Sequence, residues 1–223
     1  HQGLCDMIAS GELSAGAVLP SEVTLCERFS VSRSSLREAQ KMLTVAGVLE
    51  SRRGARARVS SLSPENVANS LSTIIPLLPL DTFLELFTLR EVLEGYCAAQ
   101  AAARMSAASK QHLLDVAHHL AQIEPGHEAQ ILDSEYHELL VAGAEDRTIS
   151  ALLKVLRKRG RDYHIYESVE HVNLKAISDA AHIEIAQAIQ RSDPHLASLL
   201  AAQHIETTRS WLIEYRPEPQ LFE

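Results

Sequence analysis

Apolar residues recur every three or four positions from about residue 82 to residue 215, and this periodicity constrains the fold more than any other feature of the chain. Such spacing puts the apolar side chains on one face of a helix. Turn and capping signals, such as Pro125-Gly126 and Asp193-Pro194, separate several of the predicted helices. The pattern predicts helices over 82–105, 107–123, 126–144, 147–158, 160–170, 174–191 and 194–215. We therefore expect an all-α helical bundle at residues 82–216.

The first 60 residues carry helix-turn-helix spacing. A short helix is predicted at 21–29, a tight turn follows, and Ser32 can cap a second helix that runs to about residue 46. The buried face of the second helix is predicted to hold four residues: Leu36, Ala39, Leu43 and Ala46. A compact pair of helices of this kind is typical of proteins that place their second helix in the major groove of DNA.

A small β wing is expected after these helices. Residues 48–51 and 52–59 predict two short strands around a basic turn. We therefore predict a mainly α protein with a winged helix-turn-helix at 1–60, and a linker at 61–81 where Ser, Pro and Asn gather. Because the chain opens inside a predicted helix, we expect a short segment to precede it.

Charge is distributed unevenly along the chain. The formal net charge is −8, which by itself argues against nucleic acid, because binding phosphate requires Lys and Arg. Between Arg28 and Arg58, however, eight basic residues accompany only Glu38 and Glu50. The alternative is a solvated charged surface. The helix-turn-helix spacing favours a DNA-facing one.

The predicted recognition helix and wing supply side chains suited to DNA. Arginine can donate two hydrogen bonds to guanine, while hydroxyl groups and helix N-terminal amides can hold phosphates. A wing can reach the adjacent groove. We predict contacts with double-stranded operator DNA from the start of the helix and from the wing, through Arg33, Ser34, Ser35, Arg37, Arg52, Arg53 and Gly54.

The cysteines and the hydropathy pattern indicate a cytoplasmic protein without a membrane partner. Cys5, Cys26 and Cys97 are far apart and form no Cys-x-x-Cys pair, so we expect them to be reduced and structural. No apolar run approaches the 18 to 20 or so residues that a membrane-spanning helix needs.

One carboxylate and three histidines occupy apolar helix faces, where a polar group is costly to bury without a partner. Asp133 and His137 are four residues apart and so lie one above the other, and His182 and His204 follow on two later helices. In a bundle core they could converge on a divalent transition metal, because imidazole suits Zn, Ni, Cu and Fe and a carboxylate extends the choice to Mn. Alternatively, each histidine is a hydrogen-bonded core residue.

Four short motifs precede or flank the arginine-rich wing: Leu-Pro-Ser-Glu at 19–22, Val-Ser-Arg at 31–33, Leu-Arg-Glu-Ala at 36–39 and Gly-Val-Leu at 47–49. In these motifs the N-terminal part resembles the GntR family of bacterial regulators. The resemblance covers most of residues 4–59 and implies a winged helix-turn-helix that binds DNA. Val23 departs from it, because members of the family usually carry an arginine there that touches DNA, and Ala55 and Ala57 stand in the wing where glycine is common.

Residues from about 83 to 215 resemble the FCD ligand-binding domain of the FadR subfamily. In that domain an Asp-x-x-x-His helix is followed by one histidine on each of two later helices. The resemblance implies a divalent metal, Zn, Ni or Mn, bound by Asp133, His137, His182 and His204, with a small carboxylic acid completing its coordination. Asp146 departs from the family, in which an asparagine is common near this position.

Arg90 is a further charged residue on an apolar stripe, and Glu94 lies one turn after it. Arg90 either pairs with Glu94 or binds an effector carboxylate, as the resemblance implies, and the two roles are compatible if Glu94 orients Arg90.

Together these features predict a homodimeric transcriptional regulator, a repressor, whose operator affinity depends on a small carboxylic acid at the metal site. An activator could use the same parts. Two alternatives are a regulator that senses the metal itself and a metal-dependent hydrolase or decarboxylase with an appended DNA-binding domain. The hydrolase leaves the basic winged helix unexplained, and a purely architectural DNA binder would not need a polar core in its second domain.

Overall fold

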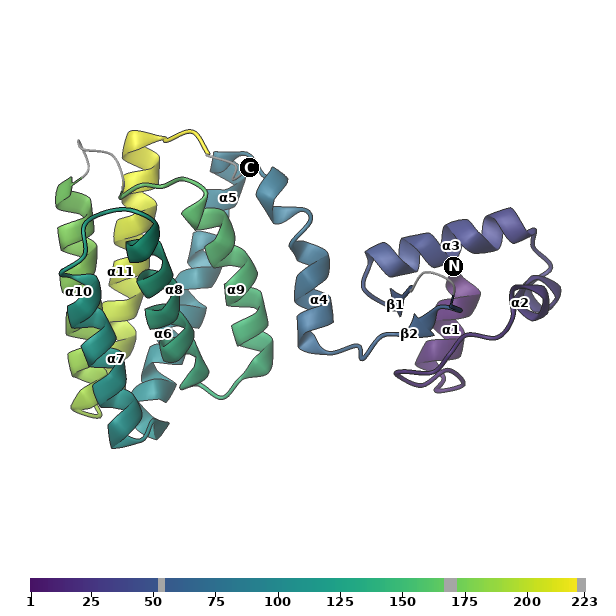
Figure 1. Ribbon diagram of the computed structural model, residues 1–223, viewed down its shortest axis with the longest axis horizontal. Coiled ribbons are helices and arrows are strands. Elements are labelled where there is room, and N and C mark those ends of the chain that lie inside the picture. The colour runs from purple at the N-terminus through teal and green to yellow at the C-terminus, as the bar shows by residue number, and fades with distance from the viewer. Residues whose placement is uncertain (52–54, 167–171, 220–223) are drawn as a thin grey trace. The chain divides into compact units, whose positions relative to one another are not determined.

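The computed structural model describes residues 1–51, 55–166 and 172–219, without the side chains of Asn69, Val172 and Asn173. The chain forms two compact units, His1–Ile74 and Ile75–Glu223 (Figure 1). The prediction of a mainly helical protein with an N-terminal winged helix-turn-helix and a C-terminal helical bundle is confirmed.

The N-terminal unit surrounds a small apolar core, and its leucines Leu4, Leu25 and Leu43 are almost completely buried. Val59 from the wing closes this core. The unit consists of α1 (Gln2–Ala9), α2 (Glu22–Phe29), α3 (Arg33–Val45), β1 (Leu49–Glu50), β2 (Arg58–Val59) and α4 (Pro64–Leu71).

Serine caps begin both helices of the helix-turn-helix. Thr24 N donates to Ser21 Oγ over 3.1 Å, and Ser35 N donates to Ser32 Oγ over the same distance. These bonds satisfy backbone amides that have no partner within the helix. The buried face of α3 is as predicted except at Ala46, which caps the helix end and is exposed.

The wing is a two-stranded antiparallel sheet in which Leu49 pairs with Val59. Gly47 makes the turn into β1 with a φ of 73°, and a Cβ there would lie 3.0 Å from the backbone oxygen of Asn66. Glycine therefore meets both a conformational and a steric requirement at this position. The segment 61–81 contains helix α4 and the 3-10 turn Ile75–Leu77, and Leu80 begins the next helix.

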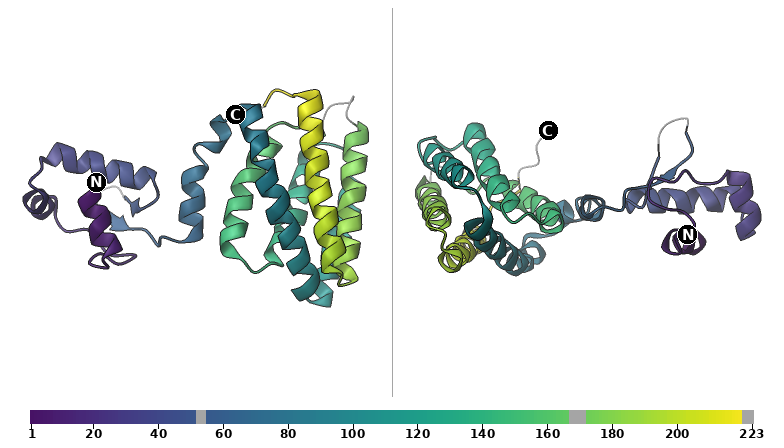
Figure 2. Two further views of the ribbon diagram at one scale, coloured as in Figure 1. Left: turned by 180° about the vertical axis from the view of Figure 1, so that it is seen from behind. Right: turned by 90° about the horizontal axis from the view of Figure 1, so that it is seen from below.

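The C-terminal unit is a bundle of long helices, and Figure 2 shows them from two further sides. The predicted helix 82–105 is divided at Leu86, and the predicted helix 160–170 is wrong for the described residues, because α9 runs to Arg161 and no helix forms at 162–166. The helices are α5 (Leu80–Glu85), α6 (Phe87–Arg104), α7 (Ala107–Leu120), α8 (His127–Ala142), α9 (Arg147–Arg161), α10 (Val172–Gln190) and α11 (Pro194–Tyr215). None of the helices in the described part of the chain has both the length and the hydrophobicity needed to cross a bilayer.

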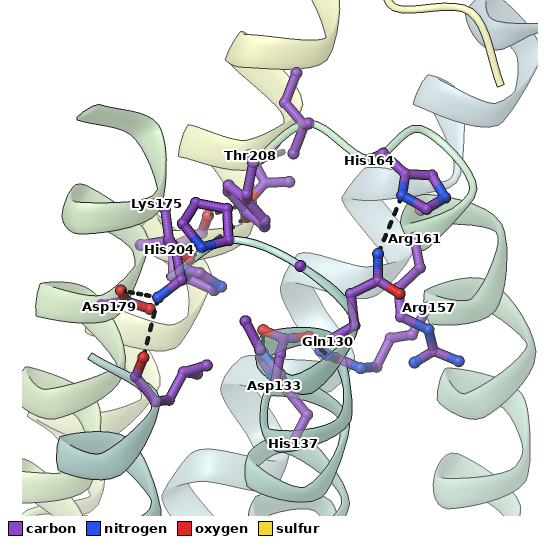
Figure 3. Close-up of a pocket in the computed structure, with 18 of the residues that line it drawn as sticks. Gln130, Asp133, His137, Arg157, Arg161, His164, Lys175, Asp179, His204 and Thr208 are labelled. Atoms are coloured by element: carbon purple, nitrogen blue, oxygen red, sulfur yellow. Dashed lines mark hydrogen bonds and ion pairs between the residues drawn. The ribbon is translucent and has the colours of Figure 1, made fainter. Parts of the chain in front are cut away.

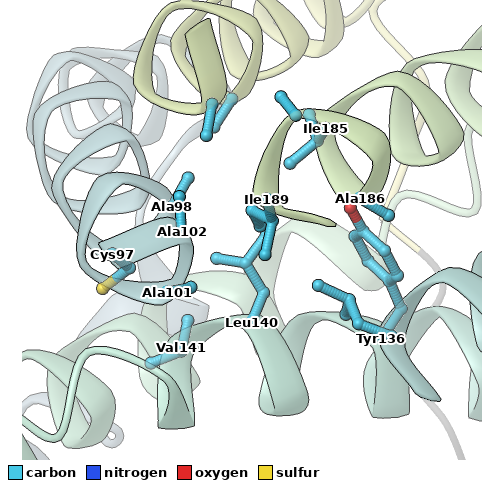
Figure 4. Packing of buried hydrophobic residues seen from close by; sticks show 14 of the residues in the cluster. Cys97, Ala98, Ala101, Ala102, Tyr136, Leu140, Val141, Ile185, Ala186 and Ile189 are labelled. Atoms are coloured by element: carbon cyan, nitrogen blue, oxygen red, sulfur yellow. The ribbon is translucent and has the colours of Figure 1, made fainter. Parts of the chain in front are cut away.

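Small residues let the bundle helices approach closely. Ala98, Ala101 and Ala102 of α6 lie in one apolar cluster with residues of α8 and α10 (Figure 4). At Gly95 an added Cβ would lie 3.2 Å from the backbone oxygen of Ser198 in α11. The core therefore depends on close packing of helix backbones as well as on large side chains.

Candidate functional site

The start of α3 presents the side chains that the sequence assigns to DNA. Arg33, Ser34, Ser35 and Arg37 are all exposed. Arg37 donates from Nε and from a terminal nitrogen to the two carboxylate oxygens of Glu22, each over 2.9 Å. Both side chains are substantially exposed, so this ion pair is weak.

The remaining predicted DNA contacts, Arg52, Arg53 and Gly54, lie outside the described residues. Val23, which stands where an arginine is common among similar regulators, is 48% exposed on α2. It supplies neither a charge nor a hydrogen bond to that surface.

Three histidines meet inside the helical bundle. His137 of α8, His182 of α10 and His204 of α11 are all buried, and one ring nitrogen of each lies within 4.8 Å of the others. The Nε2 atoms of His137 and His182 are 3.2 Å apart. Two ligands held about 2.0 to 2.1 Å from one tetrahedral ion lie about 3.3 to 3.4 Å apart, so this spacing suits two ligands of one metal.

Asp133 adjoins the histidines on α8. Its Oδ1 lies 3.6 Å from His137 Nε2 and 3.8 Å from His182 Nε2. The four residues that the sequence singles out are thus brought together, with the closest grouping among the three histidines, whose ligand nitrogens lie within 4.8 Å of one another. The Asp133 side chain is 23% exposed, whereas the three imidazoles are buried.

The environment keeps the imidazoles neutral. Burial lowers the pKa of His182 and of His204 to about 3, with nearby positive charge and neighbouring imidazoles contributing. Burial also moves the pKa of His137 well below its usual range, and the Arg157 guanidinium acts in the same direction. Neutral imidazole has the free nitrogen lone pair that metal binding requires, so the donor set fits a divalent transition metal.

A buried network of two arginines and one glutamate lies against the histidines. Arg90 donates to Glu94 Oε1 from Nε over 3.0 Å and from a terminal nitrogen over 2.8 Å, which is the pairing expected from their spacing. Arg157 of α9 approaches Glu94 Oε2 at 3.2 Å and Asp133 Oδ2 at 3.4 Å. Burial by itself raises the pKa of Glu94, but the two guanidinium groups outweigh it and hold the pKa below its usual range.

Arg157 belongs to this network and lines the pocket, but it was not among the residues singled out from the sequence. It is only 9% exposed and joins α9 to α6 and α8. A signal was available, because Arg157 is four residues after Leu153 and so lies on the buried stripe of its helix. Because α9 contains many other basic residues, Arg157 did not stand out in the sequence.

A pocket adjoins the cluster and brings its polar groups to a common space (Figure 3). Asp133, His137 and His204 line it together with Arg90 and Arg157. Another part of its wall carries polar groups from α10, α11 and the turn after α9, namely Tyr166, Lys175, Ser178, Asp179 and Thr208.

The site residues and the apolar core residues lie on different segments of the same helices. In α8, Asp133 and His137 precede Leu140, and in α10, His182 precedes Ile185 and Ile189. Leu140, Ile185 and Ile189 belong to one apolar cluster, whereas Asp133 and His137 line the pocket, so neighbouring segments of one helix serve different parts of the bundle.

Asp146 has a structural role. Its carboxylate accepts from the backbone amides of Thr148 and Ile149, each over 2.9 Å, and so caps α9. The aspartate is therefore a suitable N-cap in place of the asparagine that is common there.

Comparison with known proteins agrees with this architecture. The model of bacterial regulatory proteins of the gntR family matches residues 1–59, and that of the FCD domain matches 85–207. The Glc operon transcriptional activator of Escherichia coli K12 is 27% identical over 219 residues, covering 91% of this chain and 83% of that protein. The Exu regulon transcriptional regulator of the same organism is 26% identical over 214 residues, covering 94% and 81%.

A solved structure, Streptococcus agalactiae GntR, is 28% identical with a TM-score of 0.55, covering 94% of this chain and 96% of that one. The chain therefore belongs to the GntR family of bacterial regulatory proteins, as a DNA-binding transcriptional regulator with an FCD domain of the FadR type, and it is not an enzyme.

Proposed function

We propose that the chain is a homodimeric repressor whose affinity for its operator is changed by a small carboxylic acid bound next to a metal ion in the C-terminal domain. The convergence of three buried, neutral imidazoles on one point beside Asp133 is the observation that carries this proposal. An effector acts only if it binds one conformational state more tightly than the other.

In this proposal Asp133, His137, His182 and His204 hold the metal. Zn, Ni and Mn are the ions that imidazole and carboxylate donors favour. When bound, such an ion supplies open coordination positions for carboxylate oxygens. The packing of three helices holds the imidazole rings of the buried histidines in place, and Asp133 is the one negatively charged ligand of the site.

Arg90 is proposed to bind the effector carboxylate. It lines the pocket and is held in place by Glu94, which accepts from two of its nitrogens. A guanidinium fixed in this way can still donate to a carboxylate from its remaining N–H groups. Arg157 adds a second fixed positive charge to the same wall.

DNA binding is assigned to the exposed start of α3, with Arg33 and Arg37 as the side chains that read bases, and to the wing. Two copies would place their α3 helices on the half-sites of a palindromic operator. Replacing Arg33 by Ala should weaken operator binding by about 1 to 3 kcal/mol. Replacing Lys154, an exposed residue of α9, should leave operator binding unchanged.

The test compares a double variant, His182→Ala with His204→Ala, with a control, His118→Ala with His195→Ala, in which both histidines are exposed. Elemental analysis and thermal shifts with acetate, succinate and citrate, with and without chelator, report metal and acid binding. We expect the site variant to lose metal and acid response and to keep metal-free DNA binding. A site variant that retains stoichiometric metal, or a folded one that loses all DNA binding, contradicts the proposal.

A regulator that senses the metal itself is the second candidate, because the three histidines and Asp133 offer four donors, enough for a tetrahedral ion without an acid. Release of operator DNA by Zn, Ni or Mn alone, in the absence of any acid, would favour it.

A further inference from the structure

A second charged pair lies in the pocket wall, away from the arginine and glutamate network. Lys175 and Asp179 are one turn apart on α10 and are 8% and 7% exposed. Lys175 Nζ donates to Asp179 Oδ2 over 2.6 Å and to the backbone oxygen of Leu120 over 3.0 Å, as the dashed lines in Figure 3 show. Both side chains line the pocket.

Capping of a helix explains Lys175 but not Asp179. Leu120 is the last residue of α7, and its carbonyl accepts from the backbone amide of Ile123 over 3.2 Å, so Lys175 adds a second, charged donor at this helix end. The buried Lys110 donates to the backbone oxygen of Ala102 near the end of α6, and its second bond goes to the hydroxyl of Ser192. A buried lysine in this bundle can therefore cap a helix without a carboxylate.

The buried position of Asp179 disfavours the charged form of its carboxyl group. Burial raises the pKa of its carboxyl, and Asp133 raises it further, while Lys175 opposes both. An ionised group in such a place costs stability unless all its polar atoms are satisfied. The pair therefore has a cost that a structural role for Lys175 alone does not require.

The pair keeps hydrogen-bonding capacity on its pocket side. Among the residues that the structure describes, Lys175 donates two hydrogen bonds out of three, and Asp179 Oδ1 accepts none. Within that part of the chain the pair therefore keeps one donor and one acceptor for a ligand. A hydroxyl group complements both, because it accepts one hydrogen bond and donates another.

We propose that Lys175 and Asp179 form a second subsite that binds a hydroxyl group of the effector, at a carbon removed from the carboxylate that the metal and Arg90 hold. This assignment rests on the proposed function and narrows it to hydroxylated monocarboxylic acids. A methyl group in the subsite leaves the third N–H group of Lys175 and the Oδ1 atom of Asp179 without a hydrogen bond from the ligand, which is costly where water is displaced. A second carboxylate on the ligand is repelled by the negative charges of Asp179 and Asp133.

The test uses acids of equal length that differ only at the far end. Butyrate, 4-hydroxybutyrate and succinate end in a methyl, a hydroxyl and a carboxylate, and valerate, 5-hydroxyvalerate and glutarate repeat the set with one more carbon. Calorimetric titration of the full-length, metal-loaded protein gives each dissociation constant. We expect the hydroxyl acid to bind about tenfold or more tightly than its methyl and carboxylate counterparts at the length that spans the pocket.

The variant Asp179→Asn keeps the size of the side chain and an oxygen for Lys175, and should reduce the preference for hydroxyl over methyl to about threefold or less. Lys110→Met is the matched control, because it removes a buried capping lysine that does not line the pocket. It should lower stability and leave the preference unchanged.

Four outcomes overturn this assignment. Equal binding of methyl and hydroxyl acids, or an unchanged preference in Asp179→Asn, removes the subsite while the metal-dependent acid site stands. If succinate or glutarate binds more tightly than the hydroxyl acid of the same length, the subsite binds a second carboxylate and not a hydroxyl group. Failure of every acid to bind overturns the proposed function as well.

Discussion

Replacing Glu94 by Gln should destabilise the C-terminal bundle more than any surface change of the same kind. Glu94 is 2% exposed and neutralises Arg90 and Arg157, which are 5% and 9% exposed. The variant keeps the side-chain volume but removes the charge, so Arg90 loses its ion-pair partner while Arg157 keeps Asp133 at 3.4 Å. Breaking a buried pair costs about 3 to 5 kcal/mol, and because the amide can still accept one hydrogen bond we expect about 3 kcal/mol.

The measurement is calorimetric unfolding in chelator, so that metal binding does not contribute. For a unit of this size a loss of about 3 kcal/mol lowers the melting temperature by about 6 to 12 °C. Glu206→Gln is the control, because Glu206 pairs with Arg209 on the surface of α11, where such pairs contribute about 1 kcal/mol or less. A loss in Glu94→Gln no larger than in the control would refute the view that this carboxylate holds the network together.

Three further predictions concern pH, a glycine and a helix cap. Burial lowers the pKa of His182 and His204 to about 3, so as pH falls these histidines are protonated in the unfolded chain before they are protonated in the folded one. In chelator, the free energy of unfolding should therefore decrease as pH falls below about 6.5, by about 1.4 kcal/mol per pH unit for each histidine. Urea titrations at several pH values test this, and a variant with both histidines replaced by Gln should show a weaker dependence of stability on pH. Gly47→Ala should lose about 1 kcal/mol more than Gly16→Ala, because both have a positive φ but only the first meets a backbone oxygen at 3.0 Å; equal losses would show that the contact relaxes freely. Ser32→Ala should cost the N-terminal unit about 1 kcal/mol in urea unfolding, and no measurable cost would mean that water replaces the cap.

Features set by neighbouring residues could be predicted from the sequence. The capped start of α3 depends on Ser32 and the three residues after it, and Asp133 and His137 share a face because helix geometry requires it. The convergence of His182 and His204 on them depends on how separate helices pack, and spacing alone left a hydrogen-bonded core as the alternative.

The wrongly predicted helix at 160–170 also reflects tertiary packing that the sequence pattern does not show. Its apolar recurrence includes Tyr163 and Ile165, which are buried because the turn after α9 packs inward. Tyr163 stacks on Phe83 of α5, with ring centroids 6.0 Å apart. A buried turn and a buried helix face leave similar apolar patterns, and only the tertiary contact distinguishes them.

Segments of one helix that line the pocket and segments that lie in the apolar cluster should differ in how well their backbone is protected. Helix segments in the apolar cluster should open only with global unfolding, whereas the segments that carry Asp133 and Lys175 rely partly on charged pairs and should open locally at lower free energy. Amide hydrogen exchange would therefore be slow at one end and faster at the other within a single helix such as α10. A ligand in the pocket then slows exchange in the segments that line it and leaves exchange in the apolar cluster unchanged, so binding can order the pocket without refolding the rest of the bundle.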